Sequence, residues 1–234
     1  MTTPPSSTDV AHGEVGDPYL ISHMTLRKLL GFLGVFMPVI LVLGVVVLKA
    51  AFEIGPHEDD EVFQPSISHY YHTIMRNAFV AIVAAFGFFL FTYRGYPDKR
   101  WWKRDRIFTN AAGACALLVA CFPTNNTGEC VILFCYIHFI AATLFFIILA
   151  YISYFLFTLS DDPPSQRTHR KRDRNKVYRI CGGVMVLCIV ILAIYFLFDL
   201  KGWPHNTVFI FEAIALIAFG ISWLTKGEAI LGDK

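Results

Sequence analysis

Four polar side chains with the spacing of one helical face lie at the start of an apolar segment. They recur at i, i+3, i+4 and i+7, so that a helix would place them in one stripe. Ionisable groups inside a membrane are costly unless they face a cavity, a partner or a ligand. Imidazoles and a guanidinium in such a stripe can contact a phosphate, bind a metal or titrate near neutral pH. The stripe consists of His69, His72, Thr73 and Arg76.

Two later apolar segments carry further ionisable side chains. His205 and Glu212 are seven residues apart at the start of the last segment, so a helix would place them on one face. His138 lies near the start of the fourth segment. Arg76 and Glu212 lie at comparable depth, and we predict that they pair with each other or share a ligand. An ion pair that only fixes helix packing is the alternative.

The histidines also suit a metal site. Three neutral imidazoles with a carboxylate or a water form a common zinc shell, and His69, His72 and His138 are the candidates for it. The spacing of Ser68 and His72 resembles the Ser/His element of the alkaline ceramidase and adiponectin-receptor superfamily of membrane hydrolases. Those enzymes also carry an HxxxH pair in a late helix, and here the last apolar segment has only His205. Headgroup contact and a histidine pH switch are competing interpretations.

Six long apolar runs position these side chains. Each is close to the ~20 residues that a helix needs to cross the hydrocarbon core of a bilayer, the third being the shortest. The chain has 234 residues, of which 56% are hydrophobic and only 16% charged, and its mean hydropathy is +0.54. These values exclude an ordinary soluble domain. We expect an all-α, six-helix transmembrane bundle with spans at residues 29–48, 73–93, 107–122, 131–159, 177–198 and 208–224.

The loops between the runs alternate in charge sign. Lys and Arg gather in the second and fourth loops and near both termini, while the other loops hold only Lys49 and Lys201. Because basic loops stay on the cytoplasmic side, both termini are predicted to be cytoplasmic. Residues 1–25 would form a disordered tail, 26–226 the transmembrane domain and 227–234 a short second tail. The histidine, arginine and glutamate side chains then belong to the outer half of the membrane.

The basic segment from Arg167 to Lys176 indicates a partner. Clusters of Lys and Arg beside a span attract anionic headgroups, so lipids of the phosphatidylserine or phosphoinositide type are expected there. Ordinary positive-inside bias is the alternative interpretation. A net charge of +2, with the basic residues along one membrane face, favours lipid over nucleic acid, which is not expected as a partner. The sequence does not define the oligomeric state.

Two features of the third run have structural interpretations. Asn110 lies near its cytoplasmic end, where a lone Asn is expected to make an interhelical hydrogen bond. Cys121 and Cys130 flank the loop that follows, and an oxidising exterior would allow a disulfide between them. Neither feature predicts a site.

Three short motifs resemble a known group of six-span proteins. The group comprises the FGF-receptor-activating-gene, damage-regulated autophagy modulator and GPI-remodelling membrane proteins, with related bacterial domains of unknown function. The resemblance covers roughly residues 28–226 and implies a part in lipid remodelling, lipid asymmetry or autophagy. It implicates, without assigning roles, Ser66, Ser68, His69, Pro123, Thr124 and His138. The motifs are Ser66-Ile67-Ser68-His69, Phe122-Pro123-Thr124 and Ile137-His138-Phe139-Ile140-Ala141-Ala142.

These observations predict an integral membrane protein with an outward-facing polar pocket that binds a lipid headgroup or takes part in lipid remodelling. A metal- or Ser/His-dependent lipid hydrolase is the alternative, and a transporter of small solutes or ions is the third hypothesis. No catalytic residue is assigned, and zinc is the one cofactor considered. The predicted ligand-binding residues are Ser66, Ser68, His69, His72, Arg76, Thr124, His138, His205 and Glu212.

Overall fold

The described part of the chain is entirely helical. The structure, a computed structural model, describes residues 23–52, 61–93, 95, 100–124, 132–160, 163–200 and 202–232, and these contain no strand. The predicted all-α class is therefore confirmed, whereas most of the predicted N-terminal tail lies outside the described residues. The long helices are α1 (His23–Phe52), α2 (Arg76–Thr92), α3 (Trp102–Cys121), α4 (Ile132–Tyr151), α5 (His169–Leu197) and α6 (Thr207–Lys226). The short helices are η1 (Ile67–His72), η2 (Ile152–Leu156) and η3 (Pro164–Gln166).

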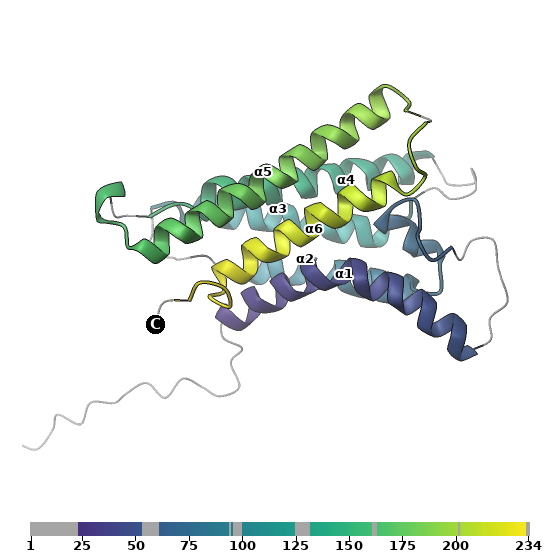
Figure 1. The fold of residues 1–234 in the computed structure, drawn as a ribbon, viewed down its shortest axis with the longest axis horizontal. Coiled ribbons are helices and arrows are strands. Elements are labelled where there is room, and N and C mark those ends of the chain that lie inside the picture. Colours follow the sequence, from purple (N-terminus) through teal and green to yellow (C-terminus); the bar gives the residue numbers. More distant parts are fainter. Residues whose placement is uncertain are drawn as a thin grey trace, which may run out of the picture.

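The long helices run side by side along the longest axis of the molecule (Figure 1). The first helix packs most extensively on the last, α5 packs on the other side of α6, and α2, α3 and α4 follow one another in the second layer. The start of α1 and the end of α6 lie at the same end of the bundle (Figure 1). The first and last helices of the chain are therefore direct neighbours in the bundle.

Four helices are long and apolar enough to cross a bilayer: Met24–Phe52, Leu133–Leu156, His169–Leu197 and Thr207–Lys226. They indicate an integral membrane protein. Two of the six predicted spans are not among them. Helix α2 is apolar but has only 17 residues, and α3 begins with a charged turn that lowers its hydropathy. Much of the apolar surface of α5 faces outward, as lipid contact requires.

Small residues allow the closest helix contacts. A Cβ atom on Gly220 would lie 2.6 Å from the carbonyl oxygen of Gly31 and 2.6 Å from the amide nitrogen of Val35, so α6 meets the backbone of α1. A Cβ atom on Gly113 would lie 2.9 Å from the carbonyl oxygen of Gly87, so α3 meets α2 in the same way. Such glycines let membrane helices approach closely enough for extensive van der Waals contact.

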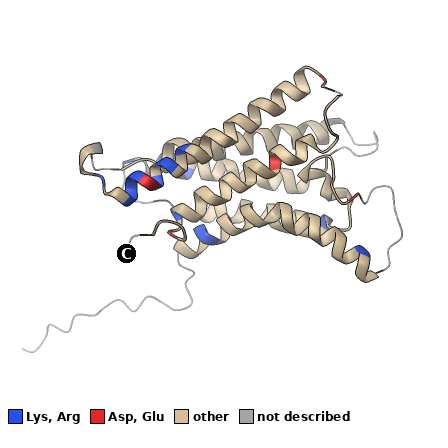
Figure 2. Cartoon of the chain, viewed as in Figure 1, with Lys and Arg blue, Asp and Glu red and all other residues tan. Residues whose placement is uncertain are grey.

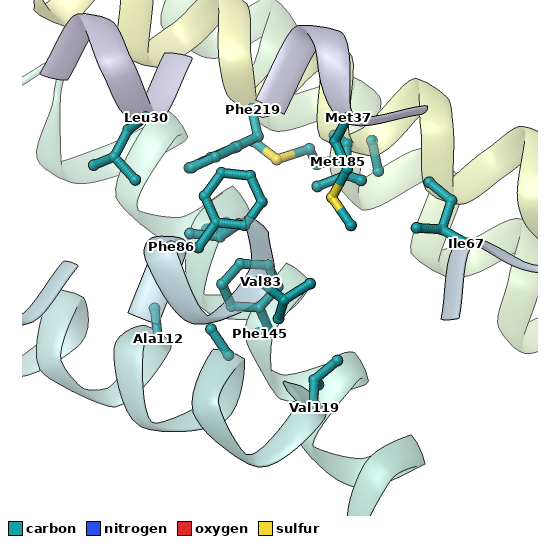
Figure 3. Packing of buried hydrophobic residues seen from close by; sticks show 14 of the residues in the cluster. Leu30, Met37, Ile67, Val83, Phe86, Ala112, Val119, Phe145, Met185 and Phe219 are labelled. Atoms are coloured by element: carbon teal, nitrogen blue, oxygen red, sulfur yellow. The ribbon is translucent and has the colours of Figure 1, made fainter. Parts of the chain in front are cut away.

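Aromatic side chains fill the centre of the bundle. The rings of Phe86 and Phe219 meet edge-on with their centroids 5.7 Å apart, and Phe145 lies 6.4 Å from Phe86 on the other side. Figure 3 shows Phe86 between these two neighbours, with Val83 beside Phe145. This packing joins α2, α4 and α6 in a single core.

Helix α4 ends in a π-helical turn, η2, that the sequence analysis did not predict. Ser153 in this turn donates a hydrogen bond to the carbonyl oxygen of Tyr178 on α5 at 3.0 Å, and its hydroxyl lies 2.7 Å from that of Ser222 on α6. A Cβ atom on Gly182 would lie 2.7 Å from the Cβ atom of Tyr154, which brings α5 against the same turn. Hydrogen bonds of this kind fix the register of three helices.

Charged residues lie mainly at the helix ends (Figure 2). The acidic residue within α6 is Glu212, one and a half turns from the start of that helix. A second cluster of buried polar side chains, which the sequence did not predict, lies at the other end of the bundle and consists of Arg27, Tyr93 and Asp105. There the Tyr93 hydroxyl donates to Asp105 at 3.3 Å, and the guanidinium of Arg27 lies 5.3 Å from the centre of the Tyr93 ring. Arg27 and Asp105 are only 3% and 4% exposed.

Candidate functional site

A cavity lies between five of the long helices and η1. The cavity has a volume of about 40 Å³, and its walls are almost entirely apolar. Among the described residues, two polar side chains line it, Ser68 from η1 and Glu212 from α6. The apolar lining residues are Met37, Ile67, Phe79, Val83, Phe86, Ala116, Val119, Ala142, Phe145, Phe146 and Leu216, several of which are labelled in Figure 3.

The segment of residues 61–75 covers one end of this cavity and is tied to α6. The amide of Ile67 donates a hydrogen bond to a carboxylate oxygen of Glu212 at 2.8 Å, and the amide of Phe209 donates to the carbonyl oxygen of Pro65 at 2.9 Å. The first amides of a helix have no partner within the helix, so Glu212 supplies one to η1. The carboxyl group therefore has a structural contact as well as a surface on the cavity.

The fold of this segment begins with a cap. Ser66 precedes η1 in extended conformation and its hydroxyl accepts a hydrogen bond from the amide of His69 at 3.3 Å. The same hydroxyl lies 2.6 Å from Nδ1 of the His69 ring. Tyr70 is fully buried and donates to the carbonyl oxygen of Val62 at 2.6 Å. Burial raises the pKa of the Tyr70 hydroxyl to about 12, so that it stays a donor at neutral pH.

The predicted stripe of four side chains on one helix is wrong. The 3₁₀ turn ends at His72, Thr73 is extended with φ −106° and ψ 175°, and α2 begins only at Arg76. The Thr73 hydroxyl accepts a hydrogen bond from the amide of Met75 at 3.1 Å, which stabilises this break in the helix. His69 and His72 therefore belong to one element and Arg76 to another. The i, i+7 spacing has meaning only within one continuous helix.

His72 and His138 both reach the C-terminal end of α3. Nε2 of His72 donates to the carbonyl oxygen of Thr124 at 2.8 Å, and Nδ1 of His138 donates to that of Phe122 at 2.6 Å. Phe122 is the C-cap of α3 and Thr124 follows it, so these two imidazoles satisfy backbone acceptors that no helical amide reaches. Nε2 of His138 is buried and has no hydrogen-bond partner.

The structure does not bring the candidate zinc ligands together. Where the chain is described, no three His, Cys, Asp or Glu side chains are placed to hold a metal ion. His69 contacts Ser66, while His72 and His138 contact different backbone carbonyls. The set of His69, His72 and His138 is thus not supported as a zinc shell, because three ligands must converge on one point at about 2.1 Å.

Arg76 and Glu212 are held by different partners. The guanidinium carbon of Arg76 lies 4.4 Å above the centre of the Tyr71 ring and the side chain is exposed, whereas Glu212 contacts Ile67. The two form no ion pair, so direct pairing is wrong. His205 pairs with Glu61 instead of sharing a site with Glu212, with 3.2 Å between Nε2 and the carboxylate oxygen. That pair is largely exposed, with 64% and 65% of the side-chain surfaces accessible.

Two structural predictions also need correction. Cys121 is a free, exposed thiol, so the Cys121–Cys130 disulfide is wrong; Cys135 is the described cysteine that is disulfide-bonded. The side-chain oxygen of Asn110 is buried and accepts no hydrogen bond, so the predicted interhelical bond through this atom is not formed. A short separation along the chain does not require two cysteines to pair, and a lone Asn in a span need not find a partner on another helix.

The basic segment from Arg167 to Lys176 has partners within the chain. Lys171 donates to the carbonyl oxygens of Phe157 and Leu159, each at 3.2 Å, beyond the end of the π-helical turn. Arg174 lies 3.4 Å from a carboxylate oxygen of Glu228. Part of this charge therefore fixes α5 to neighbouring segments, and an anionic lipid at the segment stays a prediction.

Comparison with known proteins gives a family but no activity. No curated protein and no solved structure matches the chain. One family, described as a protein of unknown function (DUF998), matches residues 66–226. This supports the expected relation to a domain of unknown function, whereas the resemblance to the FGF-receptor-activating-gene and autophagy-modulator group is not supported. The matched region begins at the cap Ser66, includes both polar residues of the cavity and ends with α6. The chain therefore belongs to the DUF998 family.

Proposed function

We propose that this protein is a lipid-binding membrane protein whose central cavity receives part of a lipid molecule. The observation that carries the proposal is an apolar cavity, inside a membrane bundle, with polar groups at the end covered by residues 61–75. Ligand pockets in proteins combine apolar walls with a few polar groups in this way. Arg76 is exposed at the start of α2, four residues after η1 ends, and its guanidinium lies over the Tyr71 ring, where it is suited to contact a phosphate outside the cavity.

We further propose that all six long helices cross the membrane and that both termini are cytoplasmic. The 61–75 segment and the end of α3 then face outward, which places the covered end of the cavity in the outer leaflet. Basic residues at the start of α1, α3 and α5 and the end of α6 support this orientation. Helix α2, which is short, and α3, which begins with a charged turn, would be shielded from lipid by neighbouring helices.

The orientation is testable through Cys121, an exposed cysteine at the end of α3. A membrane-impermeant maleimide is expected to label Cys121 in intact cells, because the thiol is free and exposed. Cys121→Ser should remove at least about nine-tenths of the label. Cys115, Cys181 and Cys188 are buried and act as internal controls that react only after denaturation. Labelling of Cys121 only after the cells are opened would place this end of α3 in the cytoplasm.

Filling the cavity tests lipid binding itself. Ala142→Phe adds a ring at a lining position, so co-purified or added lipid detected by native mass spectrometry should fall at least about tenfold. The control is Ala81→Phe, which adds the same ring on the exposed side of α2 and should leave binding unchanged. Equal lipid binding by the wild type and Ala142→Phe would refute the proposed role of the cavity.

A lipid hydrolase is the second candidate function. The observation that favours it is the 2.6 Å contact between the Ser66 hydroxyl and the His69 ring, the geometry of a nucleophile beside a base. The capping contact of Ser66 with the His69 amide accounts for the same residues without catalysis. The mass-spectrometry samples distinguish the two functions, since a hydrolase would release fatty acid and Ser66→Ala would stop the release.

A further inference from the structure

Two polar groups in the cavity have unused hydrogen-bonding capacity. One carboxylate oxygen of Glu212 accepts the Ile67 amide at 2.8 Å, and among the described residues the other oxygen accepts no hydrogen bond. The Ser68 hydroxyl, on the same cavity, likewise makes no hydrogen bond to the described part of the chain. Neither group is sealed in, because both line the open space. Polar groups placed in apolar surroundings cost free energy unless a partner satisfies them.

The charge of the cavity restricts that partner. Among the described residues that line it there is no Lys, Arg or His, and Arg76 lies outside this lining. When Glu212 is ionised, a carboxylate or phosphate placed beside it would meet a like charge with no cation of the cavity lining to offset it, in surroundings of low dielectric constant. A group that donates a hydrogen bond meets an acceptor instead. The lining therefore favours O–H or N–H donors over anions.

We infer that the cavity binds an amphiphile whose polar end is a hydroxyl or an ammonium group. This group donates a hydrogen bond to Glu212 and contacts Ser68, and the first carbons of the ligand lie against the apolar walls. This inference rests on the proposed function, lipid binding in the cavity, and specifies the ligand class. The open space of about 40 Å³ holds the equivalent of roughly three water molecules, which suits a small polar end and not a phosphodiester headgroup. Phe86, Phe145 and Leu216 supply the apolar contact.

Three photoreactive probes with one sixteen-carbon chain and different ends test the inference: a long-chain alcohol, the matching amine and the matching carboxylic acid. With the full-length protein in phosphatidylcholine nanodiscs at pH 7, the alcohol, the amine or both should crosslink at least about tenfold more than the acid. The crosslinks should map to cavity-lining residues. A preference for the alcohol identifies a hydroxyl ligand, and a preference for the amine identifies an ammonium ligand.

Glu212→Gln tests the residue that carries the selectivity. Glutamine retains an oxygen for the Ile67 amide but loses the charge, so the amine should lose at least about tenfold in crosslinking while the alcohol changes by less than about threefold. Ser68→Ala should weaken the alcohol and amine by about threefold. The control is Glu61→Gln, which neutralises an exposed acid that pairs with His205 outside the cavity and should alter no probe.

The outcomes separate this inference from the proposed function. If Ala142→Phe blocks the probes but the acid binds as well as the alcohol and the amine, the ligand class is wrong and lipid binding stands. If Ala142→Phe changes no probe, the proposed function fails as well. Gel filtration and circular dichroism show whether Glu212→Gln folds. If it does not, the selectivity of the wild-type protein among the three probes decides the ligand class.

Discussion

Replacing Trp223 with alanine is expected to cause the largest loss of stability of any single truncation in the bundle. Trp223 is 1% exposed, and its ring lies 5.1 Å from Tyr93, 5.2 Å from Phe157 and 5.9 Å from Phe219, measured between ring centroids. These contacts join the ends of α2 and α4 to α6. Truncating a buried aromatic side chain costs roughly 3 kcal/mol, since it removes its contacts and leaves a cavity.

When the protein unfolds in a membrane, the Trp223 ring moves from the protein interior to lipid, and its contacts with lipid offset only part of this cost. Lipid chains are as apolar as the protein interior, so most of the loss comes from packing. The measurement is unfolding by sodium dodecyl sulfate in mixed micelles, followed by circular dichroism. Trp203→Ala is the matched control, because Trp203 is 44% exposed and its loss should cost less than about 1 kcal/mol. Equal midpoints for the two variants would contradict the central role of Trp223.

Replacing Gly220 with valine should have a comparable effect through overpacking. A Cβ atom there would lie 2.6 Å from backbone atoms of both Gly31 and Val35, and backbone atoms cannot move aside as a flexible side chain can. We expect a loss of about 3 kcal/mol, at the upper end of the range for overpacked cores, because α6 must move away from α1. The same unfolding experiment measures it.

Gly183→Val provides the control for this substitution. Gly183 is also within a membrane helix, α5, but a Cβ atom there would meet no other atom within 4 Å. Its replacement should change the unfolding midpoint little, since the helix propensity of valine is no worse than that of glycine. If Gly183→Val were as damaging as Gly220→Val, backbone propensity and not the α1–α6 contact would explain both results.

The helices could be predicted from the sequence because hydropathy marks the apolar part of each one. All six apolar runs overlap helices, but α1, α3 and α5 begin in polar turns before their runs, and α2 begins at Arg76, three residues inside its run. Helix α5 begins at His169, although its apolar run begins at residue 177, because Thr168 caps it and accepts a hydrogen bond from the Lys171 amide. The π-helical turn at Ile152–Leu156 has no such signal, because its residues are as apolar as their neighbours.

The site could be predicted only in part. The cost of polar groups in a membrane singled out Glu212, and the resemblance pointed to Ser68; the structure places both on one cavity. The relation of Arg76 to the histidines could not be predicted, because it depends on the extended residue Thr73 that separates η1 from α2. Nothing in an apolar run distinguishes Val83 or Phe145, which face the cavity, from neighbours that face lipid.

The pairing of α1 with α6 also determines when this protein can finish folding. The first helix enters the membrane early in synthesis. The surface of α1 around Gly31 and Gly34 can pack on α6 only after that helix, which begins at Thr207, has been made. At ribosomal rates of about 5–20 residues per second, α1 remains without its main partner for several seconds or longer. During that time its exposed glycines can associate with helices of other proteins. Truncated chains that lack α6 should therefore be targets for membrane quality control.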